Sequence, residues 1–170
     1  MYGMPFITGV LIAATAGLLL LRPATSQAAC DAPCPRELQS REGMRHTRSA
    51  LDAVTVRANV LAYLKAKNIE VFAEFDHAAN ASAAGLSMPY TTVVVFGNPA
   101  VGTRLMQSFP DMALELPLKV LVWQDKQGQV WLSYHDMQHM ASMYGVTDEH
   151  PVLKGMGGLL QDLAQTATRS

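Results

Sequence analysis

The chain lacks the sequence signatures of several enzyme and binding classes. Its 170 residues carry a net charge of only −1, which gives no electrostatic reason to expect a nucleic-acid partner. We find no Ser-His-Asp ordering, no nucleophile elbow and no paired catalytic carboxylates, and these absences disfavour a hydrolase. Internal repeats and low-complexity segments are missing as well. The composition therefore indicates one domain without an evident catalytic motif.

Cysteine is scarce, because the chain has only Cys30 and Cys34. In an exported protein these two thiols are expected to form a local disulfide. Two alternatives stay open. Lipid attachment at Cys30 would suit the alanines before it, although Gln27 stands where a lipoprotein signal normally has leucine. Two thiols with three residues between them also resemble the copper-handling motif of respiratory assembly factors, but the sequence does not indicate the thioredoxin-like fold that usually carries it.

Positive charge is missing ahead of the N-terminal apolar run. Phe6 to Leu21 is uncharged and ends at Arg22-Pro23, and Ser26-Gln27-Ala28 then supplies small residues where a signal peptidase reads. The run is shorter than the ~20 apolar residues that a membrane-spanning helix usually needs. We therefore expect a cleaved signal peptide over residues 1–28 and a periplasmic or secreted protein. An uncleaved N-terminal membrane anchor is the alternative.

Two segments follow the expected signal peptide. Residues 29–42 contain both cysteines, two prolines and scattered charges without apolar periodicity, which predicts a flexible leader. Residues 43–170 are long enough to bury a proper hydrophobic core and are expected to form a single domain.

Hydrophobic periodicity within this domain predicts both helices and strands. Apolar residues at spacings of three and four predict a helix over 51–67 that ends at Asn68. The continuous β-branched and aromatic run over 91–96 predicts a central strand buried on both faces. Further strands are predicted over residues 44–49, 69–75, 118–123 and 130–134, and further helices over residues 99–109, 137–144 and 152–166. This mixed order predicts an α+β fold, with helices on one face of a largely antiparallel sheet.

The second predicted strand shows clear alternation. Ile69, Val71, Ala73 and Phe75 would lie on one face of this strand, and the residues between them would lie on the other.

Three separated blocks of residues carry a resemblance to a known family. The blocks are Phe75-Asp76-His77 with Asn80-Ala81, then Val95-Phe96-Gly97-Asn98-Pro99 with Gly102-Thr103 and Met106, then Leu116-Pro117-Leu118-Lys119, with Tyr134 following. Over residues 43–167 the chain resembles the domain-of-unknown-function family numbered 302. The resemblance implies a β-α-β4-α fold like half of the TATA-binding protein, often paired as a homodimer, and no established activity. Two departures are a glutamate at 115 where aspartate is expected, and a stretch from 135 to 143 that is unusually rich in histidine and methionine.

His77 is the strongest single candidate for chemistry. It follows a predicted strand, stands beside Asp76 and precedes a loop of small residues. A histidine in such a place would serve as an acid/base group or a metal ligand near neutral pH. A structural hydrogen bond that closes the loop is the alternative.

The turn Gly97-Asn98-Pro99 is the second candidate. Free amides at Ala100 and Val101 would cradle an anion at the start of the following helix. The favoured interpretation is simpler: the glycine lets the chain turn, and Asn98 caps the helix. The full glycine pattern of a dinucleotide site and the lysine of a phosphate loop are both missing.

Other polar residues near these blocks have weaker signals. Lys119 is expected to pair with Glu115 or to reach a pocket, and we favour the pairing. His135 and His139 would grip a metal if they share a helical face, and the neighbouring methionines would bias that site toward Cu(I). Surface histidines beside core methionines are the default interpretation.

Together these features predict a non-catalytic exported domain that binds a small ligand, a metal or a protein partner. The expected pocket is lined by His77, Asn80, Asn98 and Tyr134, with the first and third of these opening onto one shared hollow. The alternatives are a periplasmic copper-handling protein that uses His135, His139 and the two cysteines, and an enzyme that uses the Asp76-His77 region. A homodimer would cover the exposed sheet. Membrane contact is expected only if the N-terminal segment stays uncleaved or Cys30 is lipidated.

Overall fold

The computed structural model describes residues 43–147 and 150–169. The expected signal peptide, the leader and the cysteines at 30 and 34 lie outside these residues. Within them, no helix is long and apolar enough to cross a membrane.

The described chain contains the strands and helices that the periodicity predicts, in the predicted order. It also has two further short helices, one over His77–Ala83, where a loop of small residues was expected, and a 3₁₀ helix over Pro110–Leu114. The elements are β1 (Met44–Ser49), α1 (Ala53–Ala66), β2 (Glu70–Asp76), α2 (His77–Ala83), β3 (Thr91–Gly97), α3 (Pro99–Ser108), the 3₁₀ helix η1 (Pro110–Leu114), β4 (Leu118–Gln124), β5 (Val130–His135), α4 (Met137–Met143) and α5 (Pro151–Ala167).

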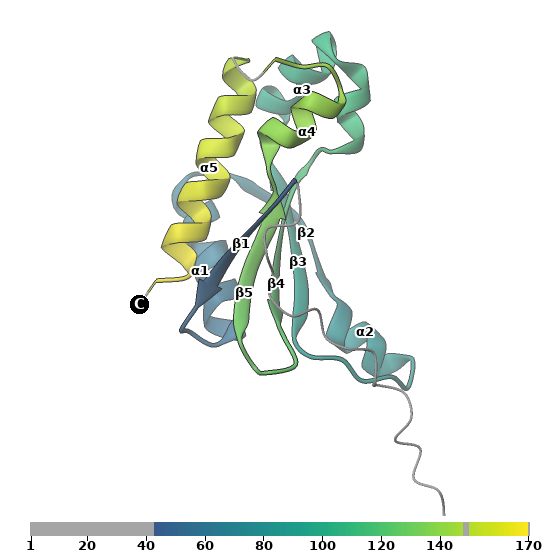
Figure 1. Cartoon of the computed structure of the whole chain (residues 1–170), viewed down its shortest axis with the longest axis vertical. Helices are drawn as coiled ribbons and strands as arrows, with labels where there is room; N and C mark the ends of the chain where they lie inside the picture. The colour runs from purple at the N-terminus through teal and green to yellow at the C-terminus, as the bar shows by residue number, and fades with distance from the viewer. Residues whose placement is uncertain (1–42, 148–149, 170) are drawn as a thin grey trace, which may run out of the picture. The chain divides into compact units, whose positions relative to one another are not determined.

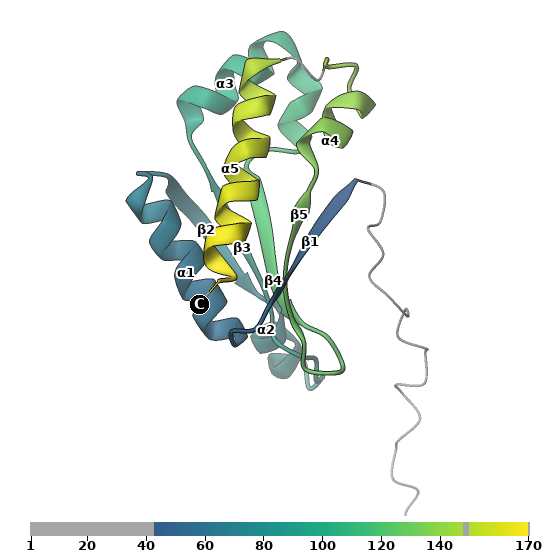
Figure 2. The same ribbon diagram turned by 60° about the vertical axis from the view of Figure 1, so that its left-hand side comes forward.

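The strands form one antiparallel sheet of five strands in the order β1-β5-β4-β3-β2. Helices α1 and α5 lie side by side on one face of this sheet (Figure 1, Figure 2). The short helices α3 and α4 gather at one end of the strands, and α2 extends from the opposite end (Figure 1). The predicted α+β architecture is therefore confirmed.

The hydrophobic core lies between the sheet and its two long helices. Alternate residues of the inner strands face the helices and are buried. Apolar residues at spacings of three and four on the helices pack against them. The buried side chains include Val94, Phe96, Val120, Val122 and Leu132 from the sheet, Val56, Val60 and Leu64 from α1, and Leu153, Leu160 and Leu163 from α5. Each such burial stabilises the fold by roughly 1.5–3 kcal/mol before entropy is counted.

Strand β3 differs from its prediction. Thr92, Val94 and Phe96 are buried, but Val93 and Val95 on the other face are only half-buried. Among the described elements, helices cover one face of the sheet only. The prediction that this strand is buried on both faces is therefore wrong, because a continuous apolar run does not report how many faces are covered.

Strand β2 also departs from simple alternation. Its register against β3 shifts between Val71 and Ala73, so Phe72 has no partner of its own in the ladder. Val71 pairs with buried Phe96, whereas Ala73 and Phe75 pair with Val95 and Val93 on the uncovered face. The prediction that Val71 shares a face with Ala73 and Phe75 is wrong. The extra residue in the strand shifts the alternation by one, so the side chains after it point to the opposite face from the one expected.

Local signals set the ends of several elements. As predicted, Asn68 ends α1, with a positive φ of 54°, and Asn98 accepts a hydrogen bond from the first turn of α3. Gly128 has a φ of 83° in the turn between β4 and β5, and Asp52 caps α1 as Asn98 caps α3. These caps satisfy amide groups that would otherwise lack partners at the helix starts.

Candidate functional site

The predicted pocket residues do not meet. His77 follows Asp76, which pairs with Thr92 at the start of β3, whereas Asn98 follows the other end of β3. The length of that strand, roughly 20 Å, therefore separates them. The prediction of one hollow shared by His77 and Asn98 is wrong, because successive turns of an antiparallel sheet lie at opposite ends.

His77 and Asn80 both lie on α2 and are exposed. Asp76 does not orient His77. Its Oδ1 accepts a hydrogen bond from the Ala79 amide at 2.8 Å and caps α2. Neither His77 nor Asn80 is among the residues that line the two grooves and the small cavity described below. Whether either residue binds a ligand stays a prediction.

Asn98 and Tyr134 each line a groove, but not the same one. Asn98 lies at an apolar groove of about 770 Å³ between the end of β3, helix α3 and the N-terminal half of α5. Tyr134 lies at a polar groove of about 570 Å³ between β1, β5 and the opposite flank of α5. Helix α5 thus forms a wall of both grooves.

The apolar groove is built by residues from four parts of the chain. Its walls come from the start of β2, the turn into α3, the loop before β4 and the first turns of α5. The lining residues are Ile69, Phe72, Gly97, Asn98, Pro99, Val101, Gly102, Met106, Leu116, Pro117, Leu118, Pro151, Val152, Gly155, Met156 and Leu159. Among these described residues Asn98 is the single polar side chain, and none of them is charged.

Two glycines and the bulge in β2 shape this groove. A Cβ atom on Gly97 would lie 3.3 Å from the Phe72 ring and 3.6 Å from the Cβ of Pro117. The absence of a side chain at Gly97 therefore lets Phe72 and Pro117 pack close to the backbone there. A Cβ atom on Gly102 would touch Leu116 at 3.5 Å. Bulges often redirect a side chain next to a functional site, and here the extra residue is Phe72. Sequence reasoning missed Phe72 because the alternation of β2 gave no sign of the bulge.

The amides that were expected to cradle an anion already have partners. The Ala100 amide donates to Asn98 Oδ1 at 3.0 Å, and the Val101 amide donates to the Asn98 carbonyl at 3.0 Å. Asn98 therefore caps α3, and the prediction of free amides at these two positions is wrong.

The polar groove centres on a fixed ion pair. Arg45 Nε donates to Asp136 Oδ2 at 2.7 Å, and a second guanidinium nitrogen contacts the same oxygen. Burial alone would raise the pKa of Asp136, but hydrogen bonds from Arg45 and from the amides of Gln138 and His139 outweigh it and hold that pKa below its usual value. Arg45 and Tyr134 are cross-strand partners. Burial raises the pKa of Tyr134, the charge of Arg45 opposes this shift, and the charge of Asp136 adds to it.

His135 and His139, which were proposed as a pair of metal ligands, lie on different elements. His135 ends β5, and α4 begins only at Met137, so His135 and His139 do not share a helical face. His135 lines a third, small cavity of about 20 Å³ with Glu115 and Lys119. Within the part of the chain that the structure describes, no group of three or more His, Cys, Asp or Glu residues is placed to hold a metal. Copper binding stays a prediction.

Lys119 and Glu115 are joined, but not through their charges. Lys119 Nζ donates to the backbone carbonyl of Glu115 at 3.2 Å. The Glu115 carboxylate instead accepts a hydrogen bond from the Tyr144 hydroxyl at 2.7 Å. This contact ties the loop before β4 to the end of α4.

Comparisons with known proteins agree on the family and the fold. A family model described as "Domain of unknown function DUF302" matches residues 45–166. The crystal structure of an uncharacterized conserved DUF302 protein from Bacillus stearothermophilus superimposes with a TM-score of 0.67 at 14% identity, over 76% of this chain and all of that one. At that identity the likeness shows the fold alone.

Curated relatives come from Brucella. Proteins named "Fluoride-specific ion channel FluC 1" from Brucella suis and Brucella abortus are each 40% identical over 87 residues, or 51% of this chain. The match covers 34% and 32% of those proteins, so the chain spans about a third of their length. The channel activity in their name is stated of those longer proteins.

Proposed function

Because the chain belongs to the DUF302 family of unknown function, whose name assigns no ligand, we propose from the geometry that the domain binds a small, neutral, apolar molecule in its apolar groove. One observation carries this proposal. Residues 97–99 and 116–118, which belong to two of the three blocks singled out in the sequence, line this groove together although they are separate along the chain.

The chemistry of the walls selects the ligand class. The groove of about 770 Å³ falls within the range of ~300–1,000 Å³ that is typical of small-molecule sites. Its lining is apolar, and a charged group placed there would lose water without gaining a partner. Asn98 supplies one amide at the rim, which suits a ligand with a single polar group. The apolar body of the ligand would be held by burial alone, at roughly 25 cal/mol for each Å² removed from water.

We further propose that this binding occurs outside the cytoplasm and without catalysis. The apolar run Phe6 to Leu21 and the small residues after it support export. The described residues that line the apolar groove also include no acid, base or nucleophile. Binding is therefore better supported there than a reaction.

Gly155 offers a direct test of the groove. It lines the apolar groove, and a Cβ atom at this position would meet no atom of a neighbouring element within 4 Å. The variant Gly155→Leu should fill the groove without harming α5, because leucine favours a helix interior more than glycine does. We expect the neutral dye N-phenyl-1-naphthylamine to fluoresce on binding the purified protein. Gly155→Leu should bind it at least tenfold more weakly, or by about 1.4 kcal/mol.

Gly158→Leu is the matched control. Gly158 lies on the same helix with the same open space beyond it, but it lines the polar groove. This variant should bind the dye as the parent protein does. Saturable dye binding that is unchanged in Gly155→Leu, or equally weakened in both variants, would contradict the proposal. Equal melting temperatures confirm that each variant is folded.

A further inference from the structure

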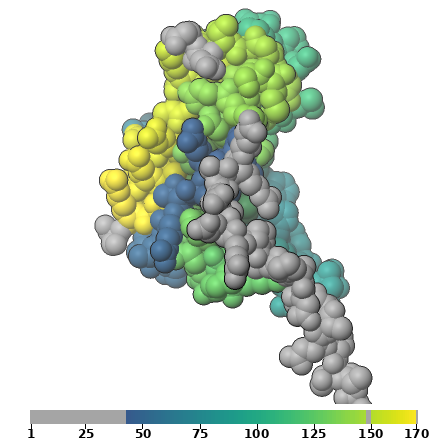
Figure 3. Space-filling view, in the orientation of Figure 1, coloured from purple at the N-terminus to yellow at the C-terminus, as the bar shows by residue number. Residues whose placement is uncertain are grey.

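Asn98 is where the apolar groove meets a ligand through a polar side chain. Figure 3 shows the flank of α5 (yellow) that runs alongside the blue surface of the first described residues, and the apolar groove lies on the other flank, next to α3. The two ends of an asparagine amide differ in chemistry, because Oδ1 only accepts hydrogen bonds and Nδ2 only donates them. The class of ligand therefore depends on which end is available.

The helix cap fixes the orientation of this amide. Asn98 Oδ1 accepts a hydrogen bond from the Ala100 amide at 3.0 Å. A flipped side chain would set the Nδ2 donor against the Ala100 N–H, which is also a donor, so the cap excludes that orientation. Among the described residues, no group accepts a hydrogen bond from Nδ2. The available end of the side chain is therefore the donor.

The backbone around Asn98 does not change this balance. The Asn98 carbonyl accepts from the amides of Val101 and Gly102, both at 3.0 Å, so its two lone pairs are engaged. Proline stands at three positions of the lining, 99, 117 and 151, and has no backbone N–H to donate. The Nδ2 group of Asn98 is therefore the polar group that a ligand meets at this end of the groove.

Burial separates the floor of the groove from its mouth. Leu118 and Met156 are only 6% and 7% exposed and form part of the floor. Phe72 and Val101 are 43% and 39% exposed, and Asn98 is exposed as well, so these three residues lie at the mouth. A bound molecule would therefore cover the floor with its apolar body and keep its polar group beside Asn98.

On the function proposed for the apolar groove, on which this inference rests, we propose that the ligand carries a neutral carbonyl oxygen, as in a ketone or an ester, and that Asn98 Nδ2 donates to it. A carbonyl accepts hydrogen bonds and donates none, so it matches a free Nδ2 group. A hydroxyl fits less well, because the described side chains of the groove offer its hydrogen no acceptor. A carboxylate would bring a charge to a lining that has no charged residue among those described.

The test compares three probes of nearly the same shape: the ketone 2-acetylnaphthalene, the alcohol 1-(2-naphthyl)ethanol and the hydrocarbon 2-ethylnaphthalene. Each is titrated against bound N-phenyl-1-naphthylamine, and displacement of the dye gives its affinity. The variant Asn98→Asp keeps a capping oxygen, which caps helices about as well as asparagine, but replaces the Nδ2 donor with an acceptor. The ketone-to-hydrocarbon affinity ratio should fall about fivefold or more in this variant, and the alcohol-to-hydrocarbon ratio should rise. Taking ratios cancels the cost of moving each probe out of water.

Gly155→Leu is the control for the shape of the groove. It should weaken all three probes by similar factors and leave their ratios unchanged, because it keeps the Nδ2 donor. If the probes displace the dye but Asn98→Asp leaves the ketone-to-hydrocarbon ratio unchanged, or Gly155→Leu lowers it as much, carbonyl recognition is wrong and binding in the groove stands. If no probe displaces the dye from the parent protein, both proposals fail. Equal melting temperatures of the parent protein and Asn98→Asp confirm that the cap is kept.

Discussion

At the scale of single residues, small irregularities decide where a ligand can bind. Phe72 lines the apolar groove because the β2 ladder slips by one residue, and it fits there because Gly97 carries no side chain. Asn98 lies at the same rim, and both its side-chain and its backbone oxygen accept amides of α3. The cap therefore fixes the start of the helix that forms one wall of the groove.

The cap at Asn98 predicts a measurable loss of stability on substitution. Asn98→Ala removes the acceptor for the Ala100 amide, so the free energy of unfolding should fall by about 1 kcal/mol. Asn80→Ala is the matched control, since this exposed asparagine lies inside α2, where alanine is the better helix former. Urea denaturation measures both. An equal loss in the two variants, or none in Asn98→Ala, would mean that the cap does not anchor α3.

At the scale of elements, α5 and α4 hold the two grooves in place. Helix α5 packs its apolar stripe on the core and leaves its two flanks to the two grooves. Helix α4 is joined to the edge strand β1 through Asp136, which caps the helix and accepts from Arg45. This one carboxylate therefore links a helix, an edge strand and the rim of the polar groove.

The link through Asp136 predicts a specific acid sensitivity. The pKa of Asp136 is lower in the folded protein than in the unfolded chain, so its ionised form stabilises the fold above the unfolded value near 3.8. That contribution should be lost as the pH falls through the folded pKa. Asp136→Asn keeps a capping side chain but removes the charge, so it should be less stable than the parent protein at neutral pH.

Thermal denaturation between neutral pH and strong acid gives the measurement. The stability gap between parent and Asp136→Asn should narrow below about pH 4. Asp111→Asn, at an exposed position in η1, serves as the control and should follow the parent protein throughout. A gap that stays constant across the acid range would show that the charge of Asp136 contributes nothing.

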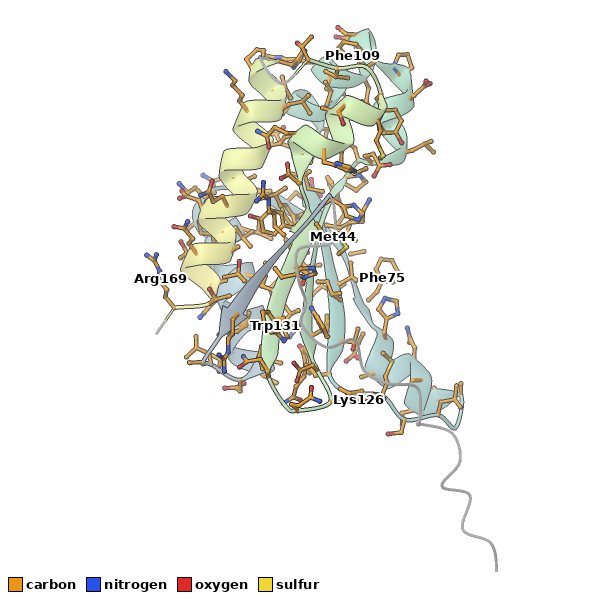
Figure 4. The ribbon with its side chains drawn as sticks, in the orientation of Figure 1. Met44, Phe75, Phe109, Lys126, Trp131 and Arg169 are labelled. Carbon is orange, nitrogen blue, oxygen red and sulfur yellow. The ribbon has the colours of Figure 1, made fainter. Side chains whose placement is uncertain are left out.

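At the scale of the whole described domain, the helices leave one face of the sheet uncovered. Val93 and Leu121 are paired on that face, and the stacked rings of Trp123 and Trp131 lie beside them. Figure 4 shows Phe75 pointing away from α5, and 49% of its surface is exposed. At the nearby end of the sheet, α2 buries none of its residues. A small open sheet of this kind is normally protected, and a second copy of the chain remains our predicted cover.

A homodimer over this face predicts different outcomes for two leucines. Leu121→Glu should abolish the dimer, because it places a charge in the centre of the apolar face. Leu114→Glu should leave the dimer intact, since Leu114 lies on η1 with 77% of its surface exposed. Native mass spectrometry at micromolar concentration measures both. A monomeric parent protein, or equal disruption by both variants, would remove the homodimer from consideration.

The sequence by itself determined the main strands and helices, the cap at Asn98 and the family. Spacings of three and four identified α1 and α5, and Asn98 marked the start of α3. These features were predictable because each depends on residues close together along the chain. The three motif blocks were predictable for the same reason, and the family match confirms the resemblance they carry.

Only the tertiary structure decided which of these features meet. Strand pairing places His77 and Asn98 at opposite ends of the sheet. The register shift in β2 places Phe72 at the apolar groove, which the alternation of residues along β2 did not indicate. The polar groove likewise depends on how α5 lies against β1, over 100 residues away in sequence. Register and packing are properties of pairs of distant segments, so no local pattern reports them.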